Sequence, residues 1–129
     1  MKRIILGITV ILVAVLATGC THHSPESVTK ALLNGMKNHN AKKVADCFYY
    51  EGTDAEKKAQ RDQAISMFEL AFNADKDLNQ IQSFKIIKVD SKSDDEANVT
   101  VSVTLKDGHT DEEDVHTIKK DGKWYVTLF

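Results

Sequence analysis

The first half of the chain beyond residue 24 carries apolar residues at helical spacing. Five apolar or small residues fall at positions i, i+3, i+4, i+7 and i+8: Val28, Ala31, Leu32, Gly35 and Met36. This spacing predicts one apolar face of a helix. Ser24 and Pro25 precede it, where a serine side chain can accept a bond from a free amide and proline fits the first turn. We therefore expect a first helix that begins after Ser24 and ends near Asn38.

Two more helices are predicted downstream. Asn40 is a suitable cap for a short helix, whose apolar side would consist of Ala41, Val44, Ala45 and Phe48. Residues 49–52 interrupt the pattern, and Thr53 and Glu56 then have the spacing of a capping box. The third helix should reach about residue 74, with a buried side formed by Ala64, Ile65, Phe68, Ala71 and Phe72.

From residue 82 the hydrophobic period changes from helical to alternating, which indicates strands. Four strands are expected, over residues 84–89, 97–105, 115–119 and 124–129. Asp107-Gly108 and Asp121-Gly122 are typical of tight hairpin turns, so the last three strands should form an antiparallel meander. Helices followed by strands predict an α+β domain, with three N-terminal helices packed on one face of a curved four-stranded antiparallel sheet.

The first nineteen residues have the pattern of a targeting segment. Lys2 and Arg3 form a basic start, and residues 4–17 are uncharged and rich in Leu, Ile and Val. That stretch would rise only about 21 Å as a helix, which is too short for a hydrocarbon core about 30 Å thick. Residues 16–20, Leu-Ala-Thr-Gly-Cys, resemble the lipobox of bacterial lipoproteins, with Ala17 in a place usually held by a large aliphatic residue.

The lipobox resemblance implies three segments: a lipoprotein signal peptide over residues 1–19, a lipidated Cys20 with a tether over residues 20–23, and a domain over residues 24–129. Plain secretion and a retained signal anchor are the alternatives. Lipidation would make the protein a membrane-anchored lipoprotein of the cell envelope. In a Gram-negative cell we expect the outer membrane, because Thr21 is not the aspartate that retains many lipoproteins at the inner membrane. In a Gram-positive cell we expect the outer face of the cytoplasmic membrane.

Only one thiol, that of Cys47, would remain free in a lipidated chain, so no internal disulfide is expected. The expected role of Cys47 is that of a small buried apolar residue, since a reactive thiol needs an electropositive, accessible site. His22 and His23 lie in the tether without the further ligands that a metal site requires. We expect neither a metal nor a cofactor.

The charge balance excludes some classes of partner. The chain has 17 basic and 19 acidic residues and a formal net charge of −2, whereas nucleic-acid-binding domains carry a basic stripe. Membrane contact should therefore come from the lipid alone. The densest charge run, Asp111 to Asp114, is expected as the solvated rim of a hairpin. The sequence contains no glycine-rich phosphate loop, serine-nucleophile motif or CxxC pair.

Two stretches carry a resemblance to a known superfamily: SPESVTKALLNGMKNHNAKKVADCF at residues 24–48 and ANVTVSVTLKDGHTDEEDVHTIKKDGKWYV at residues 97–126. Three helices followed by a meander ending in DGKWYV resemble the nuclear transport factor 2-like fold, also called ketosteroid-isomerase-like or cystatin-like. The chain is similar to small bacterial lipoproteins of unknown function in that superfamily. The resemblance implies a cone-shaped α+β roll with a cavity at its wide end, but the superfamily contains both enzymes and binding domains.

Candidate chemistry follows from comparison with the ketosteroid isomerases, which use a carboxylate base with a tyrosine and a protonated acid as oxyanion donors. Asp46, followed by Tyr49 and Tyr50, is the nearest analogue, although no motif matches the isomerases position by position. Asp46 lies off the apolar stripe, so it is also expected as a solvated helix residue, and the two tyrosines as residues closing the core. His116 is either a packed or exposed strand residue or a base in the cavity.

Both faces of the last predicted strand carry aromatic residues, which is more than a sheet with one buried face needs. Trp124, Tyr125, Val126 and Phe129 therefore form a candidate surface for a homodimer or another partner. The first hypothesis for function is a lipid-anchored, non-catalytic module that binds a small ligand or an envelope protein. The alternative is an isomerase or dehydratase that uses a cavity acid or histidine together with a tyrosine.

Overall fold

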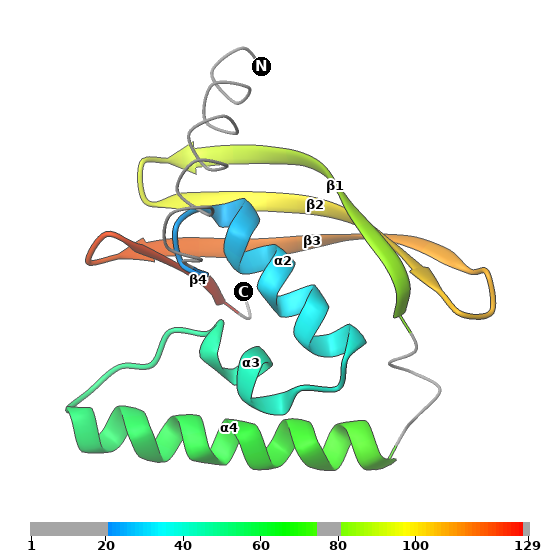
Figure 1. Cartoon of the computed structure of the whole chain (residues 1–129). Helices are drawn as coiled ribbons and strands as arrows, with labels where there is room; N and C mark the ends of the chain where they lie inside the picture. The colour runs from blue at the N-terminus through cyan, green and yellow to red at the C-terminus, as the bar shows by residue number, and fades with distance from the viewer. Residues whose placement is uncertain (1–20, 75–80, 128–129) are drawn as a thin grey trace.

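The computed structural model describes residues 21–74 and 81–127 of the chain (Figure 1). These residues form helices α2 (Pro25–Lys37), α3 (Ala41–Asp46) and α4 (Asp54–Ala74), and strands β1 (Ile81–Ser93), β2 (Glu96–Leu105), β3 (Thr110–Lys120) and β4 (Lys123–Thr127). All strand pairs are antiparallel and the sheet is open, in the order β1-β2-β3-β4. The predicted α+β class, with three helices before a four-stranded meander, is confirmed.

Each helix begins at the residue that the sequence indicates. The Ser24 hydroxyl accepts a hydrogen bond from the Ser27 amide, and the Asn40 side chain accepts one from the Lys43 amide at 3.1 Å. Thr53 and Glu56 form a reciprocal capping box, with each side chain accepting from the backbone amide of the other residue. These caps satisfy amides that have no partner inside a helix, and so they fix where each helix starts.

Two strands are longer than their hydrophobic patterns predict. β1 extends to Ser93 because its backbone continues to pair with β2, and β3 starts at Thr110 rather than near Val115. The acidic run from Asp111 to Asp114 therefore lies inside a strand rather than in a hairpin rim, although its side chains are exposed as expected. Ladder hydrogen bonds come from the backbone, so pairing with β2 can extend a strand through polar side chains.

The helices are stacked away from the sheet in sequence order. α2 lies across one face of the sheet and contacts all four strands, α3 packs against α2, and α4 packs against α3 on the side away from the sheet (Figure 1). α4 thus lies beyond the β4 edge rather than over the sheet. Its side chains Met67 and Leu70 are 64% and 71% exposed.

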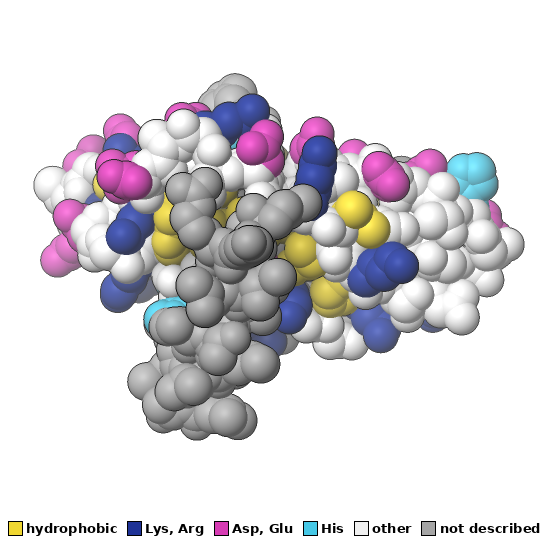
Figure 2. Space-filling model, turned by 90° about the horizontal axis from the view of Figure 1, so that it is seen from above, with side chains coloured by type: hydrophobic (Ala, Val, Ile, Leu, Met, Phe, Trp, Pro, Cys, Tyr) yellow, Lys and Arg dark blue, Asp and Glu magenta, His cyan; other side chains and the backbone are white. Residues whose placement is uncertain are grey.

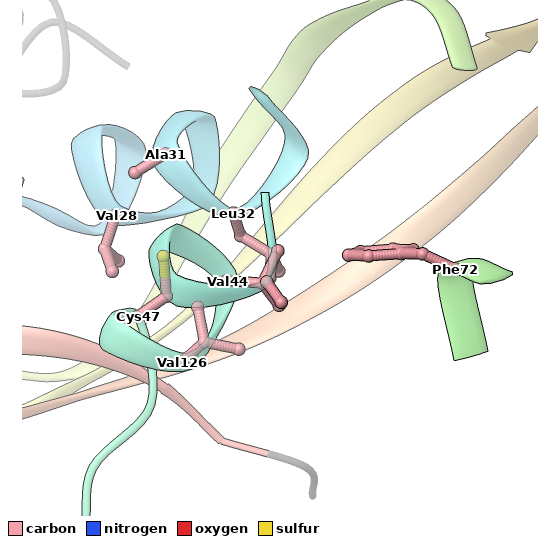
Figure 3. Close-up of a cluster of buried hydrophobic side chains, with 8 residues drawn as sticks. Val28, Ala31, Leu32, Val44, Cys47, Phe72 and Val126 are labelled. Atoms are coloured by element: carbon pink, nitrogen blue, oxygen red, sulfur yellow. The ribbon is translucent and has the colours of Figure 1, made fainter. Parts of the chain in front are cut away.

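The core consists of two clusters that share Met36 and Val115 at their margins. One lies between α2 and the strands β1 and β2, and contains Leu33, Ile81, Val99, Val101 and Val103. The other joins all three helices to β4, and contains Val28, Ala31, Leu32, Ala41, Val44, Cys47, Phe72 and Val126. In Figure 3 the Cys47 sulfur points toward α2, and Phe72 reaches from α4 toward Leu32 and Val44.

Hydrogen bonds cover the edge of β4 that does not face β3. The Val126 amide donates to the Cys47 carbonyl at 2.7 Å, and Phe48 forms a parallel bridge with Val126. The Trp124 amide donates to the His22 carbonyl at 2.9 Å, and His22 Nδ1 donates to the Trp124 carbonyl at 2.7 Å. The residues before α2 and the residues after α3 are therefore both bound to one strand edge.

The surface carries charges of both signs. On the face shown in Figure 2, acidic and basic side chains are interspersed and no broad field of one sign is seen, in agreement with the small net charge. Among residues 21–74 and 81–127, no helix has the length and apolar character needed to span a bilayer.

Substitution of Gly35 tests how closely α2 and α3 pack. A Cβ atom at this position would lie 2.8 Å from Val44 Cγ2 and 3.2 Å from the Val44 amide nitrogen, and Val44 is only 1% exposed. We predict that Gly35→Ala lowers the free energy of unfolding by about 1–2 kcal/mol, because overpacking exceeds the roughly 1 kcal/mol gained in helix propensity. Urea unfolding followed by circular dichroism measures the change. Lys37→Ala, in the same helix but exposed, is the control; a stabilised Gly35→Ala variant would contradict the close approach.

Candidate functional site

A pocket of about 740 Å³ lies between α4, the segment that follows α3, and the ends of β3 and β4. Its wall is mainly apolar. The residues that line it are Phe48, Tyr49, Tyr50, Glu51, Gln60, Ala64, Met67, Phe68, Ala71, Ile118, Val126 and Thr127. Ligand sites in proteins commonly have volumes of about 300–1,000 Å³ and apolar walls with a few polar groups, so this pocket has the dimensions of a small-molecule site.

One wall of the pocket is a single stripe of α4. Gln60, Ala64, Met67 and Ala71 follow one another at spacings of three or four residues, which places them on the same side of the helix. Small alanines alternate with larger side chains along this stripe. The wall therefore has room for a ligand beside Ala64 and Ala71.

Aromatic rings form the opposite wall, and the β4 edge holds them there. The bridge between Phe48 and Val126 sets the direction of the chain that follows α3. Phe48 stacks on Phe68 of α4 with ring centroids 5.9 Å apart. Tyr49 meets Tyr125 edge to face at 5.3 Å. Such pairs favour defined ring orientations, so the aromatic wall has a fixed shape.

Two polar side chains of the pocket bind the protein's own backbone. The Tyr50 hydroxyl donates to the Ala45 carbonyl at 2.6 Å, and Gln60 Nε2 donates to the Glu51 carbonyl at 2.7 Å. Burial first, and then the neighbouring Asp46 carboxylate, raise the pKa of Tyr50 above its ordinary value. The phenol thus remains protonated at neutral pH, and its hydroxyl donates its hydrogen bond to the backbone of α3.

Asp46 does not line this pocket. Its carboxylate accepts hydrogen bonds from Arg61 of α4, through Nε and, at 3.3 Å, through Nη2. It instead lines a second, polar hollow together with Thr21, His22, Asn40, Lys42 and Lys43. Both partners of the ion pair are partly exposed, so this pair mainly orients α4 on α3 rather than contributing much stability.

His116 is not among the lining residues of the pocket either. Its Nε2 donates to Glu96 Oε2 at 2.8 Å, and its Nδ1 lies 2.7 Å from the hydroxyl of Thr127. Thr127 does line the pocket, so His116 is linked to the site through that side chain. The register pairs His116 with Asn98 on β2 and with Thr127 on β4.

The candidate partner surface on the last strand is largely covered by the chain itself. Val126 is 4% exposed in the core, and Trp124 packs against the same cluster. The Tyr125 ring packs against two other rings, with its centroid 4.6 Å from that of His22 and 5.3 Å from that of Tyr49. Phe129 lies outside the described residues. The described part of this strand therefore offers little open apolar surface, and a homodimer stays a prediction.

The thiol of Cys47 is fully buried, and its Sγ donates to the Lys43 carbonyl at 3.2 Å. Burial first, and then the Asp46 carboxylate, raise the pKa of Cys47 to about 12. A thiol with that pKa is a poor nucleophile at neutral pH. Cys20 lies outside the described residues, and within those residues no three His, Cys, Asp or Glu side chains are grouped as metal ligands.

Sequence reasoning named Tyr49 and Tyr50, both of which line the pocket, but it missed Met67, Gln60 and Ile118. The apolar residues of α4 recur at helical spacing in the sequence, but that pattern predicted a face buried in a closed core. Nothing in the sequence marked Ile118 as a pocket residue, because strand alternation alone does not show which face of β3 is turned toward the helices.

Comparison with known proteins agrees with this architecture. Several solved structures match the chain over most of their length. One is an NTF2-like (nuclear transport factor 2-like) protein from Campylobacter jejuni with a TM-score of 0.62 and 24% identity, and the match covers 82% of this chain and 99% of that protein. An NTF2-like protein of unknown function from Shewanella oneidensis MR-1 has a TM-score of 0.51 and 15% identity, covering 78% of this chain and 88% of its own. At these identities the likeness concerns the fold. No match was found among curated proteins.

The match to a family model extends over both the helices and the sheet. The model of a domain of unknown function, DUF4878, matches residues 18–127, which include every described helix and strand. The chain therefore belongs to the DUF4878 family, and it has an α+β fold shared with NTF2-like proteins.

Proposed function

We propose that this protein is a lipid-anchored module of the bacterial cell envelope that binds an apolar small molecule in the pocket beside α4. The observation that carries the proposal is the pocket itself, with a volume of about 740 Å³ and a wall made mainly of aromatic and aliphatic side chains. Burial of apolar ligand surface supplies the free energy of binding at such a site.

The pocket supports binding better than it supports catalysis. An isomerase or dehydratase of the superfamily type needs a carboxyl or imidazole group close to a free tyrosine hydroxyl. Here the Tyr50 hydroxyl is bound to the Ala45 carbonyl, and the Asp46 carboxylate is paired with Arg61 outside the pocket. Glu51 is the one acidic residue among the described lining residues, and it is exposed. No described contact favours the enzyme alternative.

The anchor is proposed from the sequence and fits the position of the first described residues. Cys20 precedes Thr21 directly, and His22 is bound to the β4 edge by two hydrogen bonds with Trp124. Because consecutive Cα atoms are about 3.8 Å apart, a lipid on Cys20 would be attached close to the folded domain. Several acyl chains on one residue are sufficient for stable anchoring. The pocket would then operate near the membrane surface.

Binding in the pocket can be tested with a substitution whose larger side chain fills it. We predict that Ala64→Trp weakens binding of dodecan-1-ol at least about tenfold, because an indole occupies the space that the alkyl chain would take. The measurement is isothermal titration of the full chain in nanodiscs of neutral lipid, with protein-free discs subtracted. Ala59→Trp, on an exposed side of α4, is the matched control and should bind as the unmodified protein does. Equal affinity for both variants would refute the pocket as the binding site, and undetectable binding of dodecan-1-ol by the unmodified protein would refute a neutral apolar ligand.

The anchor is tested by counting thiols and weighing the mature protein. We predict that the protein purified from bacterial membranes gives no reactive thiol at pH 8 when native, because the pKa of Cys47 is raised to about 12 by burial. After denaturation one thiol should react, since Cys20 would be blocked, and intact mass should show the added acyl chains. Cys20→Ser should remove the added mass and release the protein from the membrane fraction. Two reactive thiols in the denatured protein would contradict lipidation.

A further inference from the structure

Two lysines lie at one end of the apolar pocket. The Nζ atoms of Lys57 and Lys120 are each 5.8 Å from the centroid of the Tyr49 ring, and Tyr49 is part of the pocket wall. This distance is within the range of cation–π contacts. The two lysines come from α4 and from the end of β3, so the tertiary structure brings them to one ring.

Both lysines continue the rows of residues that line the pocket. Lys57 stands three residues before Gln60 and seven before Ala64, which places it on the lining stripe of α4. Lys120 stands two residues after Ile118, which places it on the same face of β3. Two positively charged side chains therefore border the apolar wall at the end where Tyr49 lies.

The charge of these lysines is not balanced by an ion pair within residues 21–74 and 81–127. Two carboxylates also lie at this end of the pocket: Glu51 is a lining residue, and Asp121 is close enough to Tyr125 to affect its pKa. Neither is paired with Lys57 or Lys120. An incoming anion would thus meet two ammonium groups whose described contacts are with an aromatic face.

From this arrangement we propose that the pocket takes a single-chain amphipathic anion, a long-chain carboxylate, with its alkyl chain along α4 and its head group at the Tyr49 end, where Lys57 and Lys120 lie. The stripe from Gln60 to Ala71 is about 17 Å long at 1.5 Å per residue, which is the scale of an extended alkyl chain. The proposal rests on the proposed binding function and adds the chemical class of the ligand. Ammonium–carboxylate hydrogen bonds are stronger than neutral ones, so the head group would set the preference.

The test compares a charged and a neutral probe of equal chain length, dodecanoate and dodecan-1-ol. Titrations use the full chain in nanodiscs of neutral lipid, with protein-free discs subtracted. We expect the double variant Lys57→Gln/Lys120→Gln to weaken dodecanoate binding about tenfold and to change dodecan-1-ol binding less than about twofold. Lys57→Arg/Lys120→Arg keeps both charges and should retain dodecanoate binding.

The control variant Lys85→Gln/Lys106→Gln removes the same charge at exposed positions on β1 and after β2, and should bind both probes as the unmodified protein does. Unchanged dodecanoate affinity in the Lys57/Lys120 variant would overturn the proposal. An equal loss for both probes, or an equal loss in the control variant, would also overturn it. If the unmodified protein binds dodecan-1-ol but not dodecanoate, the carboxylate ligand fails while the proposed function stands. If it binds neither probe, the proposed function fails as well.

Discussion

The edge of β4 is the constraint on which the rest of the structure depends. The amides of Trp124 and Val126 point away from β3 and would lack partners if this edge were bare. His22 accepts from the first and Cys47 from the second, so segments on either side of the α2–α3 pair are bound to the same strand. Unpaired backbone groups are costly when buried and prone to pairing with other chains when exposed. Covering the edge in this way fixes the helical pair on the sheet.

The pocket follows from the same contact. The parallel bridge between Phe48 and Val126 aligns the chain with β4 after α3 ends. Tyr49 and Tyr50 therefore lie beside the sheet edge rather than over the sheet. α4 then packs on the far side of α3, joined by the stacked rings of Phe48 and Phe68 and by the Arg61–Asp46 ion pair. Because α4 does not lie on the sheet, its apolar stripe faces a partly open space. That space is the pocket.

The residues that suggested catalysis each hold the scaffold together. Tyr50 ties its segment to the end of α3, Asp46 orients α4 through Arg61, and His116 links β2 to β4 through Glu96 and Thr127. A binding site needs shape, apolar surface and a few charges at its mouth, and it does not need activated groups. Membership of the DUF4878 family and the likeness to NTF2-like structures describe the domain, whereas a fold of this kind serves several functions.

Local interactions made much of the architecture readable from the sequence. Ser24, Asn40 and Thr53 cap the helices that follow them, and the left-handed backbone of Asp121 and Gly122 makes the predicted hairpin turn. These features involve residues a few positions apart, so the amino acids determine them directly. The tertiary structure alone decided that β3 runs through the acidic residues 111–114, that Trp124 and Val126 face the core, and that Lys57 and Lys120 meet at Tyr49. Each of these depends on backbone pairing or helix placement between distant segments, which no local pattern of side chains encodes.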